Sequence, residues 1–208
     1  MAFGPHDAAT HAVGRARDLL QASRSPQLPP RVRADMRRLS VILAVAALDT
    51  YMHRLIVERA FTHQELPRSL ATIDVPFDRL LAEADASGEA ARRPSHHSRP
   101  RVAVKRVLRD RLLRRTFQSF EDVGKALSMA GRSRRWESIG QQLKPALAPD
   151  EIRVRLNAVV ARRNQIVHEG DYRRLERPRN SRRNPISTAD ASSAINFLAN
   201  LIDAIHAG

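Results

Sequence analysis

The stretch from Asp150 to Gly170 constrains the fold most, because it combines a helical pattern with a clear end. Its apolar residues recur at the spacing of one face of an α-helix: Ile152, Leu156, Val159, Val160 and Val167. Gly170 is the residue type that most often follows a helix, because glycine adopts the left-handed conformation without a steric cost. We therefore expect a helix from Asp150 to Glu169 that ends at Gly170.

Three polar residues gather near the end of this expected helix. At about 100° per residue, Arg163 falls near the middle of the apolar stripe and not on the solvent-facing side. A guanidinium keeps its proton in proteins, so Arg163 must be paired or must line a cleft. Asn164 lies four residues before His168 and shares its face of the helix. The pattern therefore brings a cation, an amide and a titratable imidazole to one helix end.

The rest of the chain also has helical patterns. Residues 39–57 are apolar almost all round, which predicts a central, buried helix over residues 32–60. Two capping-box patterns predict helix starts: Ser119 with Asp122, and Ser187 with Asp190. Amphipathic patterns predict further helices over residues 9–20, 76–86, 102–113, 134–143 and 194–205. No alternation with period two reaches the length of a strand, so the expected fold is all-α.

The length of the chain, 208 residues, is enough for one domain with a sizeable core. We expect a single domain over residues 1–208, in which residues 1–31 form an N-terminal helix and a proline-rich linker. Residues 87–101 and 172–186 are expected to be basic loops. The longest apolar run, Val41 to Leu48, is too short to span a membrane, and the first residues lack the apolar core of a secretion signal. We therefore expect a cytoplasmic protein with no membrane association.

The composition indicates the kind of partner more than the fold. The formal net charge is +14, which favours a polyanion such as nucleic acid; the alternative is a solvated basic surface. Aromatic residues make up only 4% of the chain, which argues against a sheet that stacks bases. The chain has no cysteine, no phosphate-binding glycine loop and no recognisable zinc motif. We therefore expect no metal and no cofactor.

Arginines crowd the expected loop that follows His168. Arg173, Arg174 and Arg177 are expected to contact RNA phosphates there, together with Arg162 at the end of the helix. The loop adjoins any site built around His168, which favours this interpretation over a merely solvated charged loop.

Arg163, Asn164 and His168 together resemble the Arg-x4-His signature of the HEPN ribonucleases. Three other segments occur in the order seen in the RiboL-PSP-HEPN subgroup: Ala46–Tyr51, Thr116–Asp122 and Trp136. The resemblance covers the chain from about Leu39 to the C-terminus. It implies a helical bundle, a composite site at a dimer interface and cleavage of RNA without metal. Many relatives act as toxins or defence nucleases, which implies an antitoxin or another defence protein as partner.

The sequence departs from the toxin group that pairs with a nucleotidyltransferase antitoxin. That group has a tyrosine two residues after the histidine, where this chain has Gly170. The nearest tyrosine is Tyr172, so regulation by modification of the group's tyrosine is not expected here.

An arginine and a histidine are sufficient in principle to cleave RNA. A base removes the proton of the 2′-OH, the oxygen attacks the adjacent phosphate, and an acid protonates the leaving 5′-oxygen. The products carry a 2′,3′-cyclic phosphate and a 5′-OH, and DNA, which lacks the nucleophile, is not cleaved. In-line transfer needs the base and the acid on opposite sides of the phosphorus, so His168 alone cannot supply both. A twofold homodimer through the Arg163–His168 face would supply both positions.

Asp49 is the one carboxylate in the apolar middle of the expected buried helix, residues 39–57, so it needs a partner. We expect it to support the site by pairing with Arg163; the alternative is a local pair with His53, four residues on. The main alternative function is a catalytically inactive HEPN module that binds RNA or a partner protein, with Arg163 and Asp49 holding the bundle together. A basic DNA-binding protein ranks below both, since no compact helix-turn-helix is evident.

Overall fold

The computed structural model describes residues 3–60, 68–71, 100–132, 135–173 and 182–208. Within those ranges the chain is all-α, as predicted, and contains no strand. The helices are α1 (Pro5–Ala22), α2 (Pro30–Arg59), α3 (Arg68–Ala71), α5 (Pro100–Leu112), α6 (Phe120–Met129), α7 (Trp136–Gln142), α8 (Pro149–Glu169) and α9 (Thr188–Ala207). Tyr172 and Arg183 form an isolated antiparallel bridge between α8 and α9.

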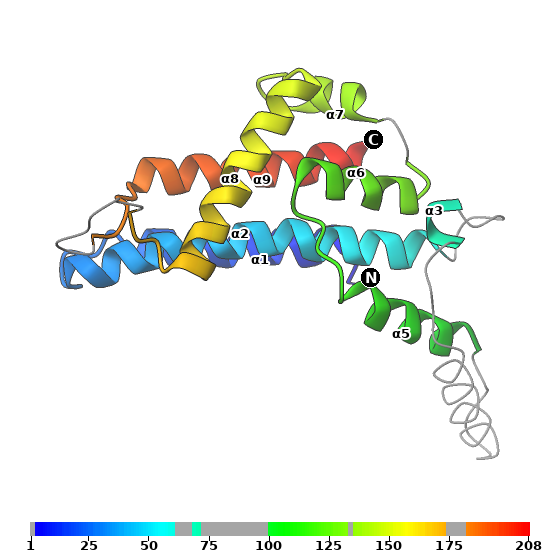
Figure 1. Cartoon of the computed structure of the whole chain (residues 1–208), viewed down its shortest axis with the longest axis horizontal. Coiled ribbons are helices and arrows are strands. Elements are labelled where there is room, and N and C mark those ends of the chain that lie inside the picture. The colour runs from blue at the N-terminus through cyan, green and yellow to red at the C-terminus, as the bar shows by residue number, and fades with distance from the viewer. Residues whose placement is uncertain (1–2, 61–67, 72–99, 133–134, 174–181) are drawn as a thin grey trace, which may run out of the picture.

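Helix α2 is the axis of the bundle. Figure 1 shows α1 running along α2, α9 following the same direction on another side, and α8 crossing over both α2 and α9. Most of the middle of α2 is buried, including Leu48, Tyr51, Met52 and Ile56, none of which is exposed to solvent. The prediction of a central, buried helix is therefore confirmed, because α2 has apolar neighbours on several sides at once.

Helix α2 is also long and apolar enough to cross a membrane. Its most apolar 18-residue window has a mean hydropathy of 1.5, and 67% of that window is buried inside the bundle. This burial against α1, α8 and α9 is what the core helix of a folded domain shows. The expectation from sequence considered only the longest apolar run, Val41 to Leu48, which is too short to span a membrane. Helix α2 as a whole is long enough.

The helix ends agree with the predicted local signals. The hydroxyl of Ser119 accepts a hydrogen bond from the backbone N–H of Asp122 at 3.1 Å, and Ser187 does the same for Asp190 at 3.0 Å. These bonds satisfy N–H groups that have no partner within the first turn of a helix. Trp136 packs against the core and stacks on Phe120, with ring centroids 4.1 Å apart.

Two of the expected elements lie mostly outside the described residues. The helix expected over residues 76–86 lies there completely, and so does most of the loop expected over residues 87–101. That loop ends slightly earlier than predicted, because α5 already begins at Pro100. Proline is well suited to the first turn of a helix, where its missing N–H has no partner to lose.

The connection between α7 and α8 brings two stretches of backbone into close contact. The N–H of Leu147 donates to the carbonyl oxygen of Gly140 at 3.1 Å. A Cβ atom added at Gly140 would lie 2.1 Å from the carbonyl oxygen of Leu147, and about 3.4 Å from the side chain of Ile152 in α8. Only glycine allows this approach, which sets where α8 begins relative to α7.

Gly140→Ala is therefore expected to lower the free energy of unfolding by roughly 1–3 kcal/mol, since backbone must move to make room for the methyl group. Gly14→Ala is the matched control: Gly14 is also helical, and nothing lies within 4 Å of the added Cβ. That change should raise stability by up to about 1 kcal/mol, because alanine favours the helix over glycine. Denaturant unfolding of both variants measures the contrast; similar effects at the two positions would contradict the close approach.

Candidate active site at the end of helix α8

Helix α8 ends as its sequence predicts. Gly170 follows the last helical residue with φ of 61° and ψ of 14°, in the left-handed region. The next residue, Asp171, also has a positive φ of 63°, which is uncommon for a residue other than glycine. Its N–H donates to the carbonyl oxygen of Gln165 at 3.1 Å and so caps the last turn. The chain therefore turns sharply away from α8 directly after His168 and Glu169.

The structure brings Arg163 and Asn164 into direct contact. An Nη atom of the half-buried Arg163 donates to the side-chain oxygen of Asn164 at 2.9 Å. Asn164 and His168 are both exposed and lie one turn apart on the same side of the helix. The guanidinium, the amide and the imidazole are therefore gathered on the last two turns of α8, and the imidazole is open to solvent.

The apolar residues of α8 become exposed in the last two turns of the helix. Ile152 and Leu156 are completely buried and Val160 is 9% exposed, whereas Val167 is 45% exposed. Val167 was expected to continue the buried row. Its position on the helix face is as expected, but the described residues do not pack over the last turn closely enough to bury it.

A buried carboxylate holds the end of α8 against α2. Asp171 is 0% exposed, and its side chain accepts hydrogen bonds from Arg38 of α2 and Arg162 of α8. The Nε–Oδ2 distance from Arg38 is 2.5 Å, and Arg162 reaches both carboxylate oxygens, one of them at 3.0 Å. A carboxylate removed from water is tolerated only when paired in this way. We call these three residues the Asp171 cluster.

Neighbouring groups extend the Asp171 cluster to the segment that precedes α9. The backbone N–H of Asn184 donates to the carbonyl oxygen of Asp171 at 2.7 Å, and its side-chain amide donates to the same oxygen at 3.2 Å. Asp35 accepts from Arg38 at 3.3 Å and from Arg183 at 2.5 Å. Three guanidiniums thus meet two carboxylates, which leaves one net positive charge beside the end of α8.

The predicted pair of Asp49 with Arg163 is wrong. The carboxylate of Asp49 accepts from the backbone N–H of Phe117 at 2.6 Å and lies 3.7 Å from Nδ1 of His53. Arg163 and Asp49 are both described by the structure, and they form no ion pair with each other. Asp49 is also 21% exposed in its side chain, so it is less buried than expected. It ties α2 to the segment before α6 instead of orienting the site.

The arginines expected to contact RNA have different environments. Arg162 belongs to the Asp171 cluster, so its charge is already paired inside the protein. Arg173 is exposed, and its backbone N–H donates to the carbonyl oxygen of Arg182 at 2.9 Å, which joins the two ends of the loop. Arg174 and Arg177 lie outside the described residues.

Sequence patterns did not identify Arg38, Asp171 or Asn184 as parts of the site. The signals were present but weak: a carboxylate directly after the terminal glycine of α8, and an arginine within the helix predicted to be central. Within the described ranges, no group of three histidine or acidic side chains gathers closely enough to hold a metal ion.

The fold and this helix end define an all-helical domain with an Arg-Asn-x3-His constellation on its surface. The family model described as RiboL-PSP-HEPN matches residues 15–207, and the chain belongs to that family. Searches of curated proteins and of solved structures gave no match.

Asp171→Ala is expected to lower the free energy of unfolding by about 3–5 kcal/mol, because it leaves the guanidiniums of Arg38 and Arg162 without their buried partner. Asp150→Ala removes the matched exposed pair with Arg153, in which Asp150 is 82% exposed, and should cost about 1 kcal/mol or less. Thermal or denaturant unfolding of the two variants measures the difference. Equal losses would show that the Asp171 cluster contributes no more than a surface ion pair.

Proposed function

We propose that this protein is a metal-independent endoribonuclease that cleaves RNA at a site formed by Arg163, Asn164 and His168. The observation that carries the proposal is the position of these side chains on the last two turns of α8, in a chain of the RiboL-PSP-HEPN family. An exposed imidazole and a guanidinium at one helix end are the minimum that this reaction requires. His168 has no structural contact that would otherwise explain it among the described residues.

In the proposed reaction His168 transfers protons at the scissile phosphate. As a base it takes the proton of the 2′-OH, whose oxygen then forms a bond to phosphorus while the bond to the 5′-oxygen breaks. An acid returns a proton to that 5′-oxygen, so the products carry a 2′,3′-cyclic phosphate and a 5′-OH. Arg163 stabilises the negative charge that accumulates on the phosphoryl oxygens. Asn164 holds the guanidinium in place through the 2.9 Å hydrogen bond that it accepts.

We further propose that the active form is a homodimer through this face. One His168 cannot stand on both sides of the phosphorus, and a twofold axis brings a second copy to the opposite side. Exposed apolar side chains adjoin the site and would be covered in such a dimer. Leu39 next to Arg38 is 49% exposed, and Val167 and Tyr172 are each 45% exposed.

The surroundings of the site suit a polyanion. The net charge of the chain is +14, and the ion pairs around Asp171 leave a positive excess beside the helix end. We propose that Arg173, Arg174 and Arg177 contact the RNA backbone beyond the cleaved phosphate. We also propose that the protein acts as a toxin or anti-phage defence nuclease in the cytoplasm, held in check by an antitoxin or another defence protein.

His168→Ala is expected to reduce cleavage of single-stranded RNA by about 10²–10⁴-fold, the range that a general acid or base contributes. Its melting temperature should be unchanged, because His168 is exposed. The assay uses labelled RNA in the presence of EDTA, with analysis of the product ends. His11→Ala, an exposed histidine of α1, is the control and should keep full activity.

Full activity of His168→Ala, or 5′-phosphate products that appear only with added magnesium, would contradict the proposed mechanism. RNA binding without cleavage by the unaltered protein would instead support the alternative of a catalytically inactive module.

Val167→Asp is expected to weaken the dimer and to lower cleavage with it, since the carboxylate would be buried in the interface without a partner. Val104→Asp in α5 is the control, because Val104 is 44% exposed and Val167 is 45% exposed. Light scattering or sedimentation measures the mass, which should be twice the 23.4 kDa chain mass for the unaltered protein and the control. A monomer that cleaves RNA at the full rate would contradict the dimeric site.

A further inference from the structure

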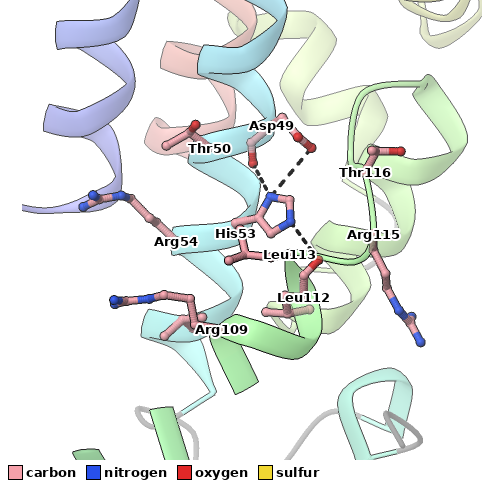
Figure 2. A pocket seen from close by; sticks show the side chains of 10 residues that line it. Asp49, Thr50, His53, Arg54, Arg109, Leu112, Leu113, Arg115 and Thr116 are labelled. Carbon is pink, nitrogen blue, oxygen red and sulfur yellow. Dashed lines mark hydrogen bonds and ion pairs between the residues drawn. The ribbon is translucent and has the colours of Figure 1, made fainter. Parts of the chain in front are cut away.

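A cavity lies between the second half of α2 and the end of α5, away from the Arg163–His168 face. Its volume is about 270 Å³, near the lower limit of small-molecule sites in proteins, which is roughly 300 Å³. Figure 2 shows His53 at its centre, Arg54 and Arg109 pointing the same way on one side, and Arg115 on the other. Leu112 and Leu113 contribute an apolar wall.

Asp49 is the one carboxylate among the described residues that line the cavity, and it already accepts hydrogen bonds. Asp49 accepts from the backbone N–H of Phe117 at 2.6 Å and from the side chain of Gln118 at 3.4 Å, and it lies 3.7 Å from His53. The ring nitrogens of His53 both face carbonyl oxygens, those of Asp49 at 2.7 Å and Leu112 at 2.9 Å. The carboxylate of Asp49 therefore contacts Phe117, Gln118 and His53, and it forms no ion pair with the arginines that line the cavity.

Among the described residues, the three arginines of the cavity have no acidic partner. In the described part of the chain, none of Arg54, Arg109 and Arg115 forms an ion pair, and Arg54 contacts the ring of Phe3 at 5.5 Å from its centroid. By contrast, Arg38 of α2 and Arg162 of α8 are both paired with Asp171. An open cavity with unpaired guanidiniums attracts an anion, because each guanidinium presents several N–H donors in a plane.

We propose that this cavity binds a phosphate group, held by Arg54 and Arg109 with Arg115 at the opposite rim. Guanidinium pairs recognise phosphate oxygens through charge-assisted hydrogen bonds, and the apolar wall accommodates a small group attached to the phosphate. The proposal rests on the cavity alone and does not require that the protein cleave RNA.

The phosphate can come from a free nucleotide or from the backbone of a bound RNA. Asp49 and Arg38 lie 11 positions apart on α2, which is close to three full turns, so they share one face of the helix. The separation along the axis is roughly 17 Å at 1.5 Å per residue. An RNA strand at the end of α8 could therefore follow α2 to the cavity, whereas a nucleotide would occupy the cavity by itself.

The test compares Arg54→Gln/Arg109→Gln with Arg15→Gln/Arg24→Gln, which removes the same charge from exposed positions of α1 and its C-terminal turn. Calorimetric titration with adenosine 5′-monophosphate and with inorganic phosphate measures the affinity for a free ligand. The affinity for a labelled single-stranded RNA is measured at several salt concentrations. Every protein in the RNA measurement carries His168→Ala, so that cleavage does not interfere. Circular dichroism confirms that each variant is folded.

A nucleotide site is supported if adenosine 5′-monophosphate binds the unaltered protein and its affinity falls at least tenfold in the cavity variant alone. An RNA contact is supported if the nucleotide does not bind but the cavity variant flattens the salt dependence of RNA binding more than the control does, because each lost phosphate contact removes counterion release. Equal behaviour of the cavity variant and the control toward every probe would overturn the proposal. Loss of cleavage in His168→Ala tests the other site and has no bearing on this one.

Discussion

The carboxylate of Asp171 is the contact on which the arrangement of the site depends. It is fully buried, and removing a charge from water costs several kcal/mol unless partners replace the lost hydration. Arg38 and Arg162 supply those partners, and they come from α2 and α8. The same residue has a positive φ, so the turn that ends α8 and the ion pairs that hold it are built around one side chain. The orientation of the last two turns of α8, which carry Asn164 and His168, follows from this anchor.

The features that could be predicted from sequence are those with local causes. The end of α8 at Gly170, the caps at Ser119 and Ser187 and the buried middle of α2 each depend on residues within a few positions of one another. Helical periodicity likewise predicted that Arg163 does not lie on the solvent-facing side of α8, and the structure shows it half-buried. These rules describe one helix at a time, and for that reason they succeeded.

The long-range pairs could not be predicted in the same way. Arg38 and Asp171 are 133 positions apart, and periodicity shows which face of a helix is buried but not which neighbour covers it. Asp49 was assigned the wrong partner because its main contact is the backbone N–H of Phe117, which has no side-chain signature in the sequence. The exposure of Val167 was not predicted for a related reason. A regular row of apolar residues does not show how far along the helix other elements pack against it.

The central claim of a composite site is tested most directly by mixing unaltered protein with His168→Ala in varied proportions, allowing subunits to exchange, and measuring RNA cleavage in EDTA. If each reaction needs His168 from both subunits, the rate should fall as the square of the fraction of unaltered chains, because only dimers with two intact copies are active. A rate that falls in direct proportion to that fraction would show that each chain acts alone and would contradict the composite site. Absence of cleavage by the unaltered protein would contradict the proposal that this protein is a nuclease.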